Sequence, residues 1–187
     1  MNTYEMTTYG HRILVLGSPG SGKSTVAGAL AGRLGLPCVH LDQHYWRSGW
    51  REPAQEMWRR QVAELAAAER WVMDGNYSNT WDLRLPRADL VLYLDMSKWL
   101  CRWRVIKRMV LNPGRVRPDM AAGCPERLDF GFLRHVWNVP KKNRPGHLRR
   151  LADPAVAPRV RFLRSPRQVQ AFLHSVTPKR SGQPPPA

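Results

Sequence analysis

Short apolar runs separated by longer, helix-like stretches form the main pattern of this chain. Five runs have this character: 12–16, 38–41, 71–73, 90–94 and 160–163. Between them, apolar positions recur at helical spacing, as in Val26, Leu30 and Leu34, which lie four residues apart. Short and almost wholly apolar strands are typical of a parallel sheet covered on both faces by helices. The pattern therefore predicts an α/β fold of three layers around a five-stranded parallel sheet.

Further helices are predicted where apolar residues repeat after a proline or a capping residue. Pro53 begins one helix, Ser97 caps a second, and Pro166 begins the last. Their expected buried faces are Met57, Val62 and Leu65 in the first, Trp99, Trp103, Ile106 and Val110 in the second, and Val169, Phe172, Leu173 and Val176 in the last. The range 129–138 is also expected to be helical.

One domain accounts for most of the chain. Residues 11–176 show no repeat and no second domain, whereas 1–10 are patternless and are expected to form a flexible leader. The range 177–187 is basic and rich in Pro, so we expect a disordered tail. Within the domain, about 43–69 is expected to bind an acceptor, and about 112–127, rich in Pro, Gly and Arg, is expected to form a lid.

Charge points to anionic partners. The chain has 187 residues, enough for one real core, with 30 Lys and Arg against 14 Asp and Glu and a net charge of +16. The cations concentrate between Lys98 and Arg180. Such an excess favours phosphorylated small molecules or nucleic acid as partners. A general bias toward Arg, ending in a basic tail, is the alternative explanation.

The cysteines and the apolar segments bear on location. Cys38, Cys101 and Cys124 are odd in number and far apart, which predicts neither a zinc site nor a disulfide framework. Reduced cysteines suit the cytoplasm. No charged N-terminal region precedes an apolar run, and no window approaches ~18 consecutive apolar residues. We therefore expect a cytoplasmic protein without a membrane partner.

The run 12–16 leads into a phosphate-binding motif. Gly17–Ser24 reads Gly-Ser-Pro-Gly-Ser-Gly-Lys-Ser and fits the P-loop pattern G-x-x-x-x-G-K-S/T, followed by helical spacing over 25–34. Its glycines allow backbone N–H groups to point at phosphates, Lys23 reaches the β- and γ-phosphates, and the Ser24 hydroxyl ligates Mg²⁺. The expected nucleotide contacts are Gly17, Ser18, Pro19, Gly20, Ser21, Gly22, Lys23, Ser24 and Thr25.

Acidic residues follow three of the predicted strands. Asp42, Asp74 and Asp95 each stand directly at a strand end, where ligands of parallel sheets bind. Asp74 before Gly75 matches the carboxylate that orients Mg²⁺, and Asp42 is expected to hold Mg²⁺ through water or to accept a proton from a substrate hydroxyl. Turn or cap formation is the structural alternative for each, and it is the favoured one for Asp95.

The arginines of the second half suggest a clamp. Transfer of a phosphoryl group needs cationic donors around the moving charge, and Arg supplies bidentate geometry. Arg104 and Arg108 lie one helical turn apart, and Arg115 and Arg117 follow in the expected lid. Arg104 and Arg115 are expected to bind the nucleotide and Arg108 and Arg117 to act in transfer. A solvated basic face is the alternative.

Aromatic side chains gather after Asp42. His44, Tyr45, Trp46, Trp50 and Trp58 fall within fifteen residues. Such residues stack a flat ring, line an acceptor pocket or simply form core. His44 alone does not make a catalytic base, and His40 is expected to be buried in its strand.

Together these residues resemble the adenylate kinase branch of P-loop kinases, and more closely the bacterial FlaR, or DNA topology modulation protein, group. The motifs that carry the closer resemblance are His40-Leu41-Asp42, Trp71-Val72-Met73-Asp74-Gly75-Asn76-Tyr77, Asp82-Leu83-Arg84-Leu85, Arg117-Pro118-Asp119-Met120 and Gly123-Cys124-Pro125-Glu126-Arg127-Leu128. The resemblance covers about residues 11 to 175. It implies the strand order 2-3-1-4-5 and binding of ATP and Mg²⁺.

The acceptor side departs from the adenylate kinase pattern. Adenylate kinases carry Asp-Gly-Phe-Pro-Arg after the third strand, and that Arg binds the nucleoside monophosphate. Here Asp74 and Gly75 are followed by Asn76, Tyr77 and Ser78, so the arginine is missing. Arg84 is a candidate substitute.

The predicted function is transfer of the γ-phosphoryl group of ATP to a small acceptor, either a nucleotide or a hydroxyl compound. The expected catalytic residues are Lys23, Asp42, Arg108 and Arg117, and the expected metal ligands are Ser24, Asp42 and Asp74. The alternatives are an ATP-dependent, nucleic-acid-binding regulator of DNA topology and a polynucleotide 5′-hydroxyl kinase. The basic ranges 141–150 and 177–180 favour them, although no known nucleic-acid-binding signature is present.

Overall fold

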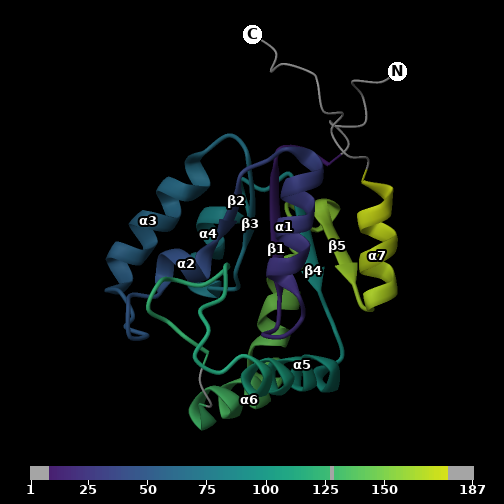
Figure 1. Cartoon of the computed structure of the whole chain (residues 1–187). Helices are drawn as coiled ribbons and strands as arrows, with labels where there is room; N and C mark the ends of the chain where they lie inside the picture. Colours follow the sequence, from purple (N-terminus) through teal and green to yellow (C-terminus); the bar gives the residue numbers. More distant parts are fainter. Residues whose placement is uncertain (1–8, 127–128, 177–187) are drawn as a thin grey trace.

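A parallel sheet of five strands forms the centre of the computed structural model (Figure 1), in the spatial order β2-β3-β1-β4-β5. The strands are β1 (Arg12–Gly17), β2 (Cys38–His40), β3 (Trp71–Asp74), β4 (Leu90–Leu94) and β5 (Val160–Leu163). The structure describes residues 9–126 and 129–176. The predicted α/β class and the strand order implied by the resemblance are both confirmed.

The central strand β1 pairs with β3 on one side and with β4 on the other. Val15 stands opposite Asp74, and Gly17 stands opposite Leu94. Because all the paired strands are parallel, their carboxyl ends meet at one edge of the sheet. The expected phosphate loop and the expected acidic residues therefore come together at that edge.

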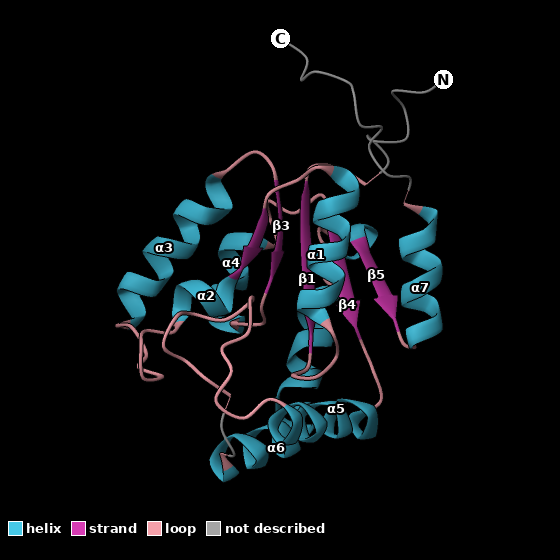
Figure 2. Cartoon of the chain, in the orientation of Figure 1, coloured by secondary structure: helices cyan, strands magenta, loops and turns pink. Residues whose placement is uncertain are grey.

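Helices cover both faces of the sheet, as Figure 2 shows. One face packs against α1 (Lys23–Leu34) and α7 (Pro166–Ser175). The opposite face packs against α3 (Gln55–Ala67), α4 (Trp81–Arg84) and the end of α6 (Phe130–Leu151). The remaining helices are α2 (Leu41–Tyr45), α5 (Lys98–Leu111), η1 (Ser78–Thr80) and η2 (Ala157–Arg159). These layers bury the alternate faces of each inner strand, which explains why those strands are apolar throughout.

The predicted buried face of α5 is wrong. Trp99 is 64% exposed, Trp103 is 61% exposed and Val110 is 58% exposed. The buried positions are instead Cys101, Arg102, Val105 and Met109. Figure 1 shows that α5 crosses beyond the carboxyl ends of the strands, beside α6, rather than lying on a sheet face. Contact with the phosphate loop and α6 therefore determines which side of α5 is buried, and this side differs from the predicted apolar face.

Three smaller expectations also fail. Strand β2 is not buried, because it lies at the sheet edge and pairs only with β3, and Cys38 is exposed. In α3, Met57 is exposed while Trp58 takes the buried position beside Val62. Helix α6 continues far beyond the predicted end at 138, through two prolines to Leu151. The burial of Leu151 against the sheet shows that packing there outweighs helix propensity.

The predicted leader and tail lie almost wholly outside the described residues, which begin at Tyr9 and end at Val176. Within the described part of the chain, no helix combines the length and the apolar character that crossing a membrane requires.

Candidate functional site

The phosphate loop connects β1 directly to α1. The amide of Ser21 donates to the Ser18 carbonyl over 3.0 Å, and this closes the turn. Gly20 has φ +80°, and a Cβ there would overlap the Cys101 carbonyl oxygen of α5. Only glycine satisfies both demands at this position. The loop is thereby held against α5, and Lys23 begins α1 with its Nζ 3.4 Å from the Ser18 carbonyl oxygen.

Asp74 lies directly beside the phosphate loop, as predicted from its place after β3. The Ser24 hydroxyl donates to Asp74 Oδ2 over 2.7 Å, and the Asp74 side chain is 5% exposed. Hydroxyl and carboxylate oxygens are ligands that suit Mg²⁺, which is bound through few protein groups and several waters. The residues present at this point therefore fit a magnesium ion.

His40 is bonded to the same carboxylate, contrary to the expectation that it is simply buried. Its Nδ1 lies 2.5 Å from Asp74 Oδ1. The hydrogen bond with Asp74, aided by one with Cys38, raises the pKa of His40 to about 10. His40 is therefore a charged partner that orients Asp74 toward Ser24. The motif His40-Leu41-Asp42 marked the residue, but its role depends on the pairing of β2 with β3.

Asp42 belongs to a different cluster. The Tyr77 hydroxyl donates to Asp42 Oδ1 over 2.6 Å. Burial, together with the negative charge of Asp42, raises the pKa of Tyr77, so the phenol stays protonated and remains a donor. Among the described residues, neither Ser24 nor Asp74 is hydrogen-bonded to Asp42. The structure thus joins Ser24 to Asp74 by one hydrogen bond and Asp42 to Tyr77, an aromatic residue, by another.

Arg84 is a structural residue and not the substitute acceptor arginine that the sequence suggested. Its side chain is completely buried, and its guanidinium donates to the carbonyls of Gly75, Asn76 and Tyr77 over 2.9, 2.6 and 3.0 Å. Burial lowers the pKa of Arg84 to about 9, partly offset by the negative charges of Asp74 and Asp82. The arginine fixes the loop after β3, so that Asn76 Oδ1 accepts from the Gly17 amide over 3.0 Å.

Two of the predicted clamp arginines meet at one carboxylate, Glu126. Arg108 Nε lies 2.9 Å and Arg117 Nε 2.7 Å from Glu126 Oε1, and the Glu126 side chain is 5% exposed. Arg117 also donates to Asp119 over 2.9 Å. Burial, followed by repulsion from Arg117, lowers the pKa of Arg108. Sequence reasoning assigned no role to Glu126, because only the folded lid brings it to α5.

The other two clamp arginines differ in position. Arg104 Nη1 donates to the Ser21 carbonyl over 3.2 Å and lines the central cavity. Arg115 is exposed and is not among the residues that line this cavity. Asp95 is also outside the cavity lining, and its carboxylate is bound by Arg144 over 2.9 and 2.8 Å. Asp95 thus forms an ion pair with Arg144, and the N-cap of α5 is Ser97.

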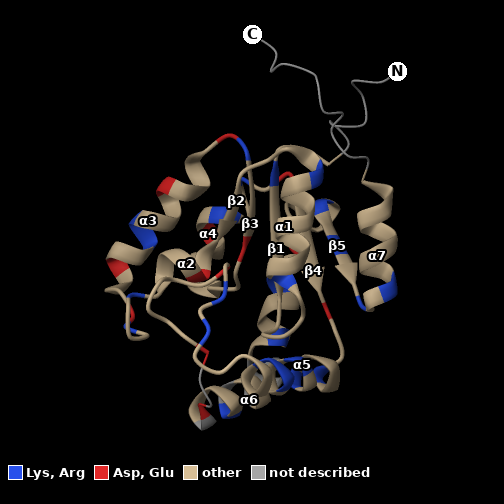
Figure 3. Ribbon diagram, in the orientation of Figure 1, with Lys and Arg blue, Asp and Glu red and all other residues tan. Residues whose placement is uncertain are grey.

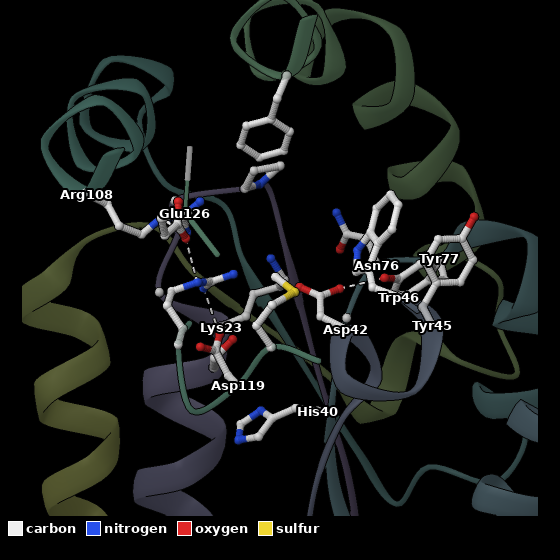
Figure 4. Close-up of a pocket in the computed structure, with 18 of the residues that line it drawn as sticks. Lys23, His40, Asp42, Tyr45, Trp46, Asn76, Tyr77, Arg108, Asp119 and Glu126 are labelled. Carbon is white, nitrogen blue, oxygen red and sulfur yellow. Dashed lines mark hydrogen bonds and ion pairs between the residues drawn. The ribbon is translucent and has the colours of Figure 1, made fainter. Parts of the chain in front are cut away.

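One cavity of about 1110 Å³ unites these groups. Lys23, Arg108 and Glu126 lie at one part of it, and Asp42, Tyr45, Trp46, Asn76 and Tyr77 lie at another, as Figure 4 shows. Figure 3 shows Lys and Arg concentrated along α5, beside the phosphate loop. The cavity therefore has a cationic phosphate side and an aromatic side that holds a carboxylate.

Comparison with known proteins gives structural neighbours only. No protein-family model and no curated protein sequence matches the chain significantly. A shikimate kinase from Acinetobacter baumannii, in complex with shikimate, matches with a TM-score of 0.55 and 14% identity, over 89% of this chain and 90% of that one. A shikimate kinase from Bacteroides thetaiotaomicron matches with a TM-score of 0.53 and 16% identity, over 88% and 95%.

A gluconokinase from Sinorhizobium meliloti matches with a TM-score of 0.51 and 21% identity, over 90% of this chain and 94% of that one. Identities this low establish the fold alone. The fold is that of P-loop kinases with the adenylate kinase-like strand order.

Proposed function

We propose that this protein is a kinase that transfers the γ-phosphoryl group of ATP to a hydroxyl group of a small acceptor. The supporting observation is that Lys23 of the phosphate loop and the carboxylate of Asp42 line the same cavity. A phosphate-binding group and a proton acceptor in one cavity are what phosphoryl transfer to a hydroxyl requires.

The donor side is made by the phosphate loop. Backbone amides of 18–24 and the N-terminus of α1 hold the phosphates, and Lys23 neutralises the β- and γ-phosphates. Ser24 and Asp74, already hydrogen-bonded to each other, are the residues that would hold Mg²⁺. When bound, the ion neutralises charge on the phosphate oxygens.

The acceptor side is organised by Asp42. Its carboxylate takes the proton from the acceptor hydroxyl, whose oxygen forms the new bond to the γ-phosphorus while the bond to the β,γ-bridging oxygen breaks and ADP leaves. Tyr77 holds Oδ1 of Asp42, and no described residue donates to Oδ2. Oδ2 of Asp42 is therefore the oxygen that acts as the general base in this proposal.

Helix α5 and the lid together supply the positive charge. Glu126 holds Arg108 and Arg117 side by side, and both arginines line the cavity. Arg104 and Arg108 approach from α5, so the transferring group is met from two segments. Arg115 is left at the outer surface of the lid and binds nucleotide only if the lid moves.

Family, domain and location are part of the same proposal. The motifs after β3 and in the lid support membership of the FlaR group. We further propose that 11–176 act as one kinase domain in the cytoplasm, with the lid over 112–127.

Transfer from γ-labelled ATP tests the proposal. The acceptor panel includes nucleoside monophosphates, nucleosides, sugars, small acids and 5′-hydroxyl oligonucleotides. Transfer to a small hydroxyl compound is the expected result. Transfer to oligonucleotides alone would favour a polynucleotide kinase, and salt-sensitive oligonucleotide binding with no transfer to any acceptor would favour the nucleic-acid-binding regulator.

Lys23→Ala tests the phosphate loop directly. Loss of a charged hydrogen bond to phosphate is worth roughly 1.5–3 kcal/mol, so ATP binding should weaken about ten- to hundredfold in calorimetry. The matched control is Lys107→Ala, which removes an exposed lysine of α5. Equal ATP affinity in the Lys23 variant and the control would refute the assignment of the loop.

Asp74→Asn tests the magnesium site. We expect turnover to fall about a hundredfold, because metal stabilisation of the transition state is worth several kcal/mol, with a much smaller change in nucleotide affinity. Asp153→Asn, at an exposed position, is the control. Unchanged turnover in the Asp74 variant would show that this carboxylate has no part in the reaction.

A further inference from the structure

The part of the cavity that faces Asp42 is built from aromatic, amide and acidic side chains. Its lining includes Asp42, Tyr45, Trp46, Trp50, Asn76 and Tyr77. Tyr45 is in edge contact with Trp46 at 5.0 Å between ring centroids, and Trp46 with Trp50 at 5.4 Å. Tyr45 and Tyr77 are tilted against each other at 4.6 Å. The rings form one continuous wall and not four isolated side chains.

The wall is held from behind, which makes it rigid. Trp58 is buried and contacts both Tyr45 and Tyr77 at 5.0 and 4.9 Å. On the lid side, Trp46 and Trp50 pack against Met120 and Cys124. Rings whose positions are fixed in this way bind a flat ligand without a large loss of side-chain entropy.

Polar groups beside the wall suit hydroxyl groups. Asp42 accepts hydrogen bonds, and Asn76, Ser78 and Asn79 also line this part of the cavity. The amide oxygen of Asn76 is taken by Gly17, which leaves the amide nitrogen as a donor. A hydroxyl group both donates and accepts, so it satisfies such a mixed set where a carboxylate or a phosphate does not.

Among the described residues, the Lys and Arg side chains that line the cavity, Lys23, Arg104, Arg108 and Arg117, all belong to its phosphate side. His40 is bound to Asp74, and Arg84 is buried under the carbonyls of the loop after β3. Nearby, Arg59 pairs with Asp82, and Arg150 donates to the Ser78 carbonyl over 2.6 Å. Arg108 and Arg117 are held by Glu126, on the phosphate side.

Two carboxylates on this side of the cavity disfavour an anionic acceptor. Asp42 and Glu52 both line the cavity beside the aromatic wall. Burial, followed by interaction with Glu52, raises the pKa of Tyr45 to about 12. A phosphate or a carboxylate on the acceptor would meet these two negative charges, with no described Lys or Arg among the lining residues on this side to compensate them. Like charges disfavour binding.

We propose that the acceptor is an uncharged, hydroxyl-bearing ring compound, a nucleoside or a neutral sugar, that lies against the wall of Tyr45, Trp46 and Tyr77 with one hydroxyl at Asp42. This assignment rests on the proposed kinase function for the reaction, but the binding preference belongs to the cavity itself and is measured separately.

Binding and transfer are measured with the full chain and two matched sets of compounds. The uncharged set contains adenosine, cytidine, ribose and glucose, and the anionic set contains their counterparts AMP, CMP, ribose 5-phosphate and glucuronate. We expect at least about tenfold tighter binding of an uncharged compound than of its anionic counterpart, by calorimetry without ATP. Nucleosides that bind where ribose does not would indicate stacking of the base, and the converse would indicate a sugar.

The aromatic wall is tested by Trp46→Leu, with Trp103→Leu as the control at an exposed site of α5. Loss of a stacking partner should weaken binding of the uncharged compound about tenfold, and Trp46→Phe should restore most of it. The control should bind as the wild type does. Equal binding in Trp46→Leu and the control would overturn the placement of the ligand on this wall.

The outcomes separate the two proposals. Transfer to a nucleoside monophosphate or to a sugar acid would overturn the uncharged class and leave the kinase function standing. Binding of an uncharged compound that depends on Trp46, without transfer from ATP, would support the class and overturn the kinase function. Failure of every compound of both sets to bind would overturn the class.

Discussion

Replacement of the buried Arg84 by methionine should destabilise the fold strongly. Methionine keeps most of the apolar stem, so the change removes chiefly the guanidinium and its bonds to the Gly75, Asn76 and Tyr77 carbonyls. These carbonyls belong to the loop that follows β3. Among the described residues, two of them have a second donor: Trp81 Nε1 donates to the Asn76 oxygen, and Thr80 donates to the Tyr77 oxygen. The substitution therefore removes hydrogen bonds from a single loop, the one that follows β3.

The size of the effect follows from burial. A hydrogen bond to a charged group contributes roughly 1.5–3 kcal/mol, and a buried acceptor left without a partner costs about 1–3 kcal/mol. The bonds of Arg84 are coupled, and methionine escapes the desolvation that the guanidinium suffers, so the separate values do not add. We expect a loss of about 3–5 kcal/mol, the range for breaking a buried charged network.

Urea unfolding followed by tryptophan fluorescence measures this loss, since Trp81 donates to the same loop at the Asn76 carbonyl. The control is Arg87→Met, three residues further along at an exposed position, where we expect a change within about 0.5 kcal/mol. Arg84→Lys should fall in between, because one ammonium does not reproduce the planar donor fork. A midpoint for Arg84→Met equal to that of Arg87→Met would refute the structural role of Arg84.

Two further predictions concern pH and packing. Burial lowers the pKa of His147 from 6.5 to about 4. Between pH 6.5 and pH 4 the unfolded chain therefore binds more protons than the folded chain does. The free energy of unfolding should fall as the pH drops through this window, by roughly 3 kcal/mol in total once pH 4 is passed. His147→Phe should show a shallower loss of unfolding free energy over that window, and an identical pH profile would exclude this histidine as its source. On α5, Val105→Ala should cost about 1–3 kcal/mol in thermal or urea unfolding, whereas Trp103→Ser should change stability by less than about 0.5 kcal/mol, because Val105 is buried and Trp103 is exposed. The reverse order would mean that the apolar stripe of α5 faces inward.

Local chemistry made much of the donor side predictable. A P-loop is a contiguous motif, and its strand and helix are read from neighbouring residues, so β1, the loop and α1 follow from about twenty positions in a row. Asp74 was also predictable, because a parallel sheet brings the carboxyl ends of its strands to one edge, and Ser24 indeed donates to it.

Contacts between distant segments were not predictable in the same way. Arg84 is an ordinary polar position in the sequence until α4 turns its guanidinium under the loop after β3. Glu126 acquires a role only when the lid carries it to Arg108 on α5. In both cases the partner is chosen by the fold, since an isolated charge has no preferred partner along the chain.

By itself, the sequence determined the class of the fold, the phosphate loop and the strand-end acids, because each depends on local spacing and on the parallel arrangement of short apolar strands. Only the tertiary structure decided which face of α5 is buried, that Asp42 pairs with Tyr77, and that the aromatic residues after β2 line a cavity. The physical reason is that burial and ion pairing are set by what each side chain meets across the fold. The spacing of apolar residues along a helix, or a single charged residue, does not specify which distant side chains will pack against it or pair with it.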